Sequence, residues 1–137
     1  MSRGDHMRRW MLGGLLLAAG CDDTIFGPQA VQPLTVEGWE GVQEVFDTYC
    51  LDCHGATAAF GQLDLETDPY GAIVSVPSST GTLNLVEPGD PDQSLLYLKT
   101  MDMQPPGTGT KMPPTGTLAA EATDILKNWI ADGATQD

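Results

Sequence analysis

The sequence is short of basic residues and of aromatic side chains, and each shortage excludes a class of protein. Six Lys and Arg stand against 19 Asp and Glu, which gives a net charge of −13. So acidic a chain repels phosphate and is a poor nucleic-acid binder, although it offers a docking surface to a basic partner. Aromatic residues make up only 7%. A core built from protein alone would be small, and the chain would gain from a large apolar prosthetic group.

An uncharged, mostly apolar run near the N-terminus is too short to cross a bilayer. It covers residues 10–20, whereas a spanning helix needs about 20 apolar residues. It follows Arg8-Arg9 and fits the hydrophobic region of a signal peptide. Its end, Leu17-Ala18-Ala19-Gly20-Cys21, resembles the lipobox of bacterial lipoproteins, which implies a lipid on Cys21. The alternatives are an ordinary signal peptide with a chance cysteine and a twin-arginine export signal.

These features predict an exported, membrane-anchored protein with one folded domain. We expect a lipoprotein-type signal peptide over 1–20, a lipid-anchored tether over 21–36 and a single domain over 37–137. The expected location is extracytoplasmic. Asp22 and Asp23 after the cysteine resemble a retention signal of enteric bacteria, which favours the inner membrane over the outer. Either Met1 or Met7 is the true start.

Apolar periodicity predicts a helix at each end of the domain. In residues 37–49 the spacing of three, four and three places four side chains on one helical face: Trp39, Val42, Phe46 and Tyr49. The last helix shows the same type of pattern in Leu118, Ala122, Ile125, Leu126, Trp129 and Ile130. Thr117 is expected to cap this helix and Gly133 to end it. No strand alternation is evident, so the predicted fold class is all-α.

Between these helices, two Asp-Pro pairs predict short helices. Asp68-Pro69 and Asp90-Pro91 each place Asp at the N-cap and Pro at the first helical position. Gln93, three residues after Asp90, suits a capping box, and the second helix is expected to continue through residues 94–98. Residues 104–116 contain four prolines and three glycines, which predicts an irregular loop stiffened by proline.

The chemistry is concentrated in Cys50-Leu51-Asp52-Cys53-His54, which is the haem c attachment motif C-x-x-C-H. On a helical turn the two cysteines share one side and can form thioethers to two haem vinyl groups, while the histidine binds the iron. A zinc site needs four ligands and these residues supply three. A thioredoxin-like dithiol would need a βαβ context, and a plain disulfide between the cysteines is a further alternative. The motif predicts one covalent haem c.

The second axial ligand must come from another residue type, because His54 is the only histidine after residue 20. Met112 is the predicted ligand, since Pro113 and Pro114 restrict the loop that carries it. Met103, also followed by a Pro-Pro pair after one residue, is the alternative. Met101 is expected to pack in the core or to face solvent. An iron with an open sixth position is a further possibility.

Four segments together resemble the class I-like c-type cytochromes, small single-haem domains common in environmental bacteria. They are residues 46–55 around the motif, residues 86–97 with Pro-Gly-Asp-Pro, residues 112–114, and residues 129–134. The resemblance covers residues 37–134 and implies a small helical domain wrapped around one covalent haem. It also implies that the first and last helices cross near Phe46 and Trp129. The glycine usual at this crossing is Val42 here, with Gly41 one residue away, which implies a different arrangement.

The resulting functional prediction is a single-electron carrier with histidine–methionine ligation, not an enzyme. The expected partners are a redox protein with a basic docking face and, through Cys21, the membrane. An open-site haem enzyme or gas-binding sensor is the main alternative, although no second histidine is available as a distal acid–base group. A module in which the haem is mainly structural is a third.

Overall fold

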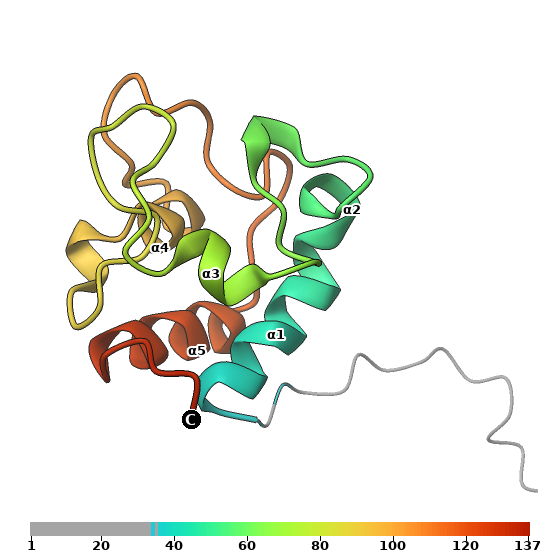
Figure 1. Ribbon diagram of the computed structural model, residues 1–137, viewed down its shortest axis with the longest axis vertical. Helices are drawn as coiled ribbons and strands as arrows, with labels where there is room; N and C mark the ends of the chain where they lie inside the picture. The colour runs from blue at the N-terminus through green and yellow to red at the C-terminus, as the bar shows by residue number, and fades with distance from the viewer. Residues whose placement is uncertain (1–33, 35) are drawn as a thin grey trace, which may run out of the picture. The chain divides into compact units, whose positions relative to one another are not determined.

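Helices form all the regular structure in the part of the chain that the structure describes. This is a computed structural model, and it describes residue 34 and residues 36–137. The helices are α1 (Gly38–Tyr49), α2 (Leu51–His54), η2 (Phe60–Gln62), α3 (Pro69–Ile73), η3 (Pro91–Gln93), α4 (Leu95–Thr100) and α5 (Ala120–Ala131) (Figure 1). Within the same residues, extended pairing is limited to three isolated bridges between positions 74 and 94. The all-α prediction is therefore confirmed.

The predicted signal peptide and the lipidation site at Cys21 lie outside the described residues. Among the helices that are described, none combines the length and the apolar character that a membrane crossing requires.

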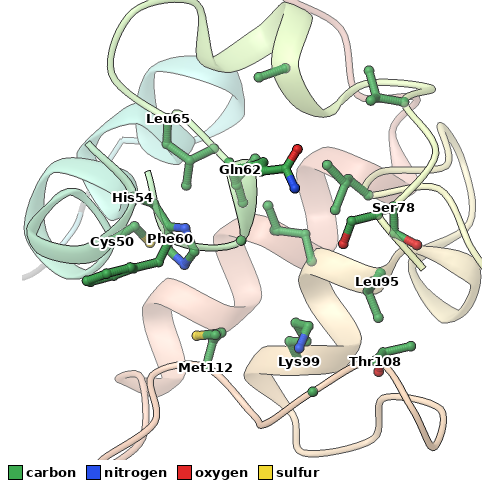
Figure 2. Close-up of a pocket in the computed structure, with 18 of the residues that line it drawn as sticks. Cys50, His54, Phe60, Gln62, Leu65, Ser78, Leu95, Lys99, Thr108 and Met112 are labelled. Carbon is green, nitrogen blue, oxygen red and sulfur yellow. The ribbon is translucent and has the colours of Figure 1, made fainter. Parts of the chain in front are cut away.

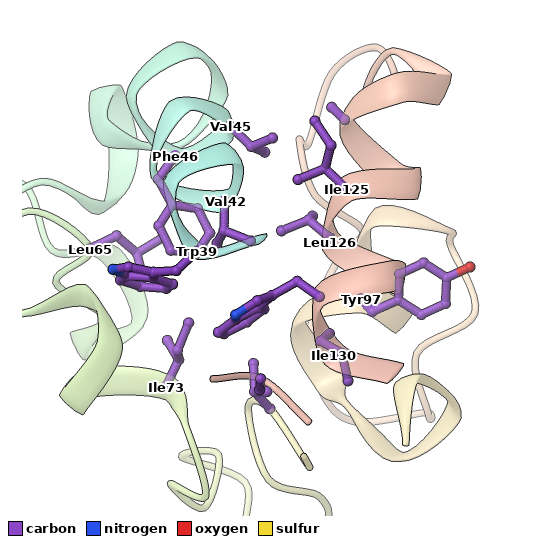
Figure 3. Packing of buried hydrophobic residues seen from close by; sticks show 14 residues of the cluster. Trp39, Val42, Val45, Phe46, Leu65, Ile73, Tyr97, Ile125, Leu126 and Ile130 are labelled. Carbon is purple, nitrogen blue, oxygen red and sulfur yellow. The ribbon is translucent and has the colours of Figure 1, made fainter. Parts of the chain in front are cut away.

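The core lies where α1 packs against α5, as Figure 3 shows. Most of the side chains that the periodicity predicted are buried, and Val45 is buried with them: Trp39, Val42 and Phe46 from α1 and Ala122, Ile125, Leu126, Trp129 and Ile130 from α5. Tyr49 and Leu118, also predicted, are only partly buried. The rings of Trp39 and Trp129 approach to 5.3 Å between centroids and hold the N-terminal end of α1. Full burial of an apolar side chain contributes about 1.5–3 kcal/mol, and the buried Phe46 holds the other end, from which the C-x-x-C-H residues continue.

Gly41 occupies the close approach between the two helices. A β-carbon at this buried position would lie 3.1 Å from Cγ2 of Ile125 and would collide with the backbone carbonyl of Val36. Val42, in the place where the resemblance puts the glycine, is instead fully buried as a core side chain. The crossing is thus made one residue earlier along α1.

The short helix at Asp68-Pro69 forms as predicted, with the Asp68 carboxylate accepting a hydrogen bond from the Gly71 amide at 3.1 Å.

The prediction of a capping box between Asp90 and Gln93 is wrong, because the Asp90 side chain makes no capping hydrogen bond. Ser94 takes an extended backbone and separates η3 from α4. Its buried hydroxyl accepts from the Glu87 amide at 2.8 Å and donates to the Asp90 carbonyl at 2.8 Å.

The last helix ends where predicted but begins later than predicted. Thr117 does not cap it, because Ala119 is extended and α5 begins at Ala120. Leu118 consequently precedes the helix and packs against the core from outside it. The C-terminal stop is confirmed, since Gly133 has a φ of 101° and its amide bonds the carbonyl of Ile130 at 3.0 Å.

Candidate functional site

A large cavity in the described part of the chain adjoins the core and is walled by segments from across the domain. Its volume is about 660 Å³, within the usual range for cofactor and ligand sites of about 300–1,000 Å³. Its apolar walls come from α1, α4, α5 and the segments around η2 and residues 76–85, and include Phe46, Leu63, Leu65, Val76, Leu85, Leu95, Leu96 and Leu126. A cavity of this size and lining suits a large, mostly apolar ligand.

The C-x-x-C-H motif contributes two of its side chains to this cavity, as Figure 2 shows. Cys50 and His54 both line it. The turn is held by backbone hydrogen bonds, from the His54 amide to the Cys50 carbonyl at 2.8 Å and from the Leu65 amide to the His54 carbonyl at 2.7 Å. Gly55 follows in close contact with the main chain, since a β-carbon there would lie 2.8 Å from the carbonyl of Leu51. The histidine is therefore fixed from both sides by main chain.

The His54 ring has one buried nitrogen. Its Nδ1 atom has no hydrogen-bond partner among the described residues, which leaves Nε2 as the nitrogen accessible to the cavity. A neutral imidazole carries a free lone pair on one nitrogen only and is a good ligand for iron. The cavity wall thus offers a fixed imidazole.

The two cysteines differ in their surroundings. Cys50 is half-buried, whereas Cys53 is exposed and is not among the residues that line the cavity. Burial, with a smaller effect of the nearby Cys53, raises the pKa of the Cys50 thiol to about 11. At neutral pH the thiol in the folded chain stays protonated and is a weak nucleophile.

Met112 lies on the opposite side of the same cavity from His54 in Figure 2. Its amide donates to the carbonyl of Lys99 at 2.9 Å, which attaches the loop to the last turn of α4. The other two methionines are placed elsewhere. Met103 is 62% exposed and Met101 is 42% exposed, and neither lines the cavity. Of the two predicted candidates for the sixth ligand, the structure brings only Met112 to the same cavity as the histidine.

The cavity also includes residues that the sequence reasoning did not identify. Lys99 is the only basic side chain among the described residues that line it, and burial lowers the pKa of its ammonium group. Phe60, which is 64% exposed, lies at the side where the motif is found (Figure 2). A sequence signal for Lys99 exists, because its spacing from Leu95 and Leu96 places all three on one face of a helix.

The comparisons with known proteins bear on this region of the chain. A family model described as Planctomycete cytochrome C matches residues 50–116. The matched span begins at Cys50 and includes His54, Lys99 and Met112. No curated protein and no solved structure matches the chain. The family match supports a cytochrome c-like domain, with haem as the bound group and electron transfer rather than catalysis as the activity.

Proposed function

We propose that the protein is a single-electron carrier that holds one haem c in this cavity, attached through thioether bonds to Cys50 and Cys53 and bound through its iron to His54. The observation that carries the proposal is that one apolar cavity of about 660 Å³ is lined by Cys50, by the imidazole of His54 and by the thioether of Met112. These are the three chemical groups that a covalently attached, six-coordinate haem requires. Cys53, one turn further along, is exposed and accessible to the second vinyl group.

Met112 is the proposed sixth ligand. Its backbone is fixed to α4 by a hydrogen bond, and its side chain lies across the cavity from the imidazole (Figure 2). Ligation by Met103 would require an exposed side chain to leave solvent and enter the cavity from outside its present wall. The loop that carries Met112 needs no such rearrangement.

When bound, haem supplies a one-electron ferric–ferrous couple. The chain would then hold the metal and exclude water from it. His54 and Met112 hold the metal in the same way in both states, so that little rearrangement accompanies electron transfer. Leucine side chains from four segments exclude water from the cavity and lower its dielectric constant. Because a medium of low dielectric constant disfavours the extra positive charge of the ferric state, this burial raises the reduction potential, as the methionine ligand does.

The proposed cellular setting follows from the N-terminal sequence. We propose that the chain is exported, lipidated at Cys21 and held at the extracytoplasmic face of a membrane, with the inner membrane preferred. Its charge of −13 favours a redox partner with a basic docking face. This setting rests on the sequence pattern alone.

An optical and redox titration of the purified holoprotein tests the proposal. The expected result is a low-spin ferric spectrum with the near-red methionine–iron charge-transfer band, together with a reversible one-electron wave. A high-spin ferric spectrum that changes when imidazole is added at low concentration, or a ferrous form that binds carbon monoxide, would contradict it and favour an open-site haem enzyme or sensor.

A further inference from the structure

We infer that Lys99 is a positioning residue for the sixth ligand: its side chain and its backbone together clamp the loop that carries Met112 onto α4. This inference rests on the proposed function, because it assigns a role to the clamp in methionine ligation. It concerns a residue that does not itself bind the metal.

The clamp has two points of attachment, and both are on Lys99. The Nζ atom of Lys99 donates a hydrogen bond to the Thr110 carbonyl at 2.8 Å. The carbonyl of Lys99 accepts a hydrogen bond from the Met112 amide at 2.9 Å. The loop is thereby attached to α4 immediately before and immediately after Lys111. Because two bonds flank a single residue, the backbone from which the Met112 side chain departs has little freedom.

The Lys99 side chain runs from α4 along the cavity wall to the loop. Lys99 lies one turn after Leu95 on α4, and both line the cavity together with Met112 (Figure 2). The loop turns beside the ammonium group at Gly109, whose φ of 85° favours glycine. The N-terminal part of the same loop is held by Thr108, whose hydroxyl donates a hydrogen bond to the Pro105 carbonyl at 2.7 Å.

Lys111 provides a matched comparison in the same loop. Its Nζ atom donates to the carbonyl of Gly116 at 2.7 Å, so the bond has the same type and nearly the same length as that of Lys99. It joins two parts of one loop, however, whereas the Lys99 bond joins the loop to a helix. Lys111 also does not line the cavity. Replacing either lysine by leucine removes one positive charge and one hydrogen bond without adding a new thioether, but only the change at Lys99 removes an attachment of the loop to α4 and leaves the backbone bond in place.

The experiment compares holoprotein variants Lys99→Leu, Lys99→Arg and Lys111→Leu, with imidazole as the probe that competes with Met112. Because the Lys99 bond is near the surface, we expect loss of this charged hydrogen bond to increase the imidazole affinity by about fivefold rather than by orders of magnitude. Lys99→Arg should keep the wild-type affinity, and Lys111→Leu should stay within about twofold of it. An unchanged affinity in Lys99→Leu, or an equal increase in Lys111→Leu, would overturn the inference.

A second measurement separates failure of the clamp from failure of the proposed ligation. Amide hydrogen exchange in residues 108–112 reports loop opening whether or not Met112 binds iron. We expect exchange about fivefold faster in Lys99→Leu than in wild type or Lys111→Leu. If the wild type lacks the methionine–iron band, the proposed ligation is wrong. The exchange rates then still show whether the Lys99 side chain holds the loop on α4. Equal exchange rates in all three proteins would overturn it.

Discussion

Exchange of the two candidate methionines for alanine is the perturbation that separates them most sharply. Met103 is 62% exposed and away from the cavity, so its truncation should change the stability by no more than about 0.5 kcal/mol and leave the iron unaffected. Met112 is half-buried on the cavity wall. Its truncation removes a partly buried side chain, at a cost of about 1 kcal/mol, and also removes the proposed iron ligand.

The expected change in reduction potential follows from the difference in affinity for the two oxidation states. If the thioether of Met112 binds ferrous iron even tenfold more tightly than ferric iron, its loss lowers the potential by about 59 mV. The assay is a spectroelectrochemical titration of Met112→Ala and Met103→Ala beside the wild type. We expect Met112→Ala to lose the near-red band, to show a lower potential and to bind carbon monoxide, and Met103→Ala to do none of these. Reversed outcomes would identify Met103 as the ligand, and no effect of either change would refute methionine ligation.

Three further predictions concern the fold, the anchor and the partner. Gly41→Ala should destabilise the holoprotein by about 1–2 kcal/mol, because the clash with Val36 and Ile125 outweighs a gain in helix propensity of about 1 kcal/mol. Thermal unfolding should then shift down by about 5–15 °C, and an unchanged midpoint would contradict the close crossing. Cys21→Ser should release a soluble form or block processing with an unaltered haem spectrum, and membrane fractionation decides between these outcomes and an unaffected anchor. Electron transfer to a basic partner should slow steeply as salt rises, because exposed charges are screened beyond about 8 Å at physiological salt. A rate independent of salt would point to an apolar docking face.

The parts of the fold that the sequence predicts are those with a strong local cause. The apolar face of α1 repeats over three turns, and three of its four predicted side chains are buried, while Tyr49 is partly buried. Likewise in α5, Ile125, Leu126 and Trp129 recur at helical spacing and are buried. Asp68-Pro69 begins a helix because its N-cap carboxylate has an amide within reach.

The errors have a common physical origin in burial and in contacts outside the local capping pattern. Asp90 and Gln93 have the sequence of a capping box, yet the buried hydroxyl of Ser94 bonds the Glu87 amide and the Asp90 carbonyl instead. Thr117 has the chemistry of a cap, but Leu118 packs against the core and the cavity and the chain becomes helical only afterwards. In both cases tertiary packing overrides local preference.

In the candidate site, too, the sequence predicts the features with a local cause and not those that depend on contacts elsewhere in the chain. The motif Cys50 to His54 is read directly from adjacent residues. The distinction between Met103 and Met112 depends on which of two similar Pro-Pro segments reaches the cavity, and the structure places only Met112 there. The helical spacing of Lys99 with Leu95 and Leu96 indicates which face it shares, but its role depends on hydrogen bonds to residues more than ten positions away, which that spacing does not encode.

The most direct test of the central claim is the intact mass of the chain under denaturing conditions after co-expression with a c-type cytochrome maturation system. The account predicts a mass increase of one haem in the wild type, which persists through denaturing electrophoresis. It predicts no increase when Cys50 and Cys53 are both replaced by alanine. A wild-type chain that emerges with its unmodified mass under these conditions would contradict the claim that the cavity holds a covalently attached haem.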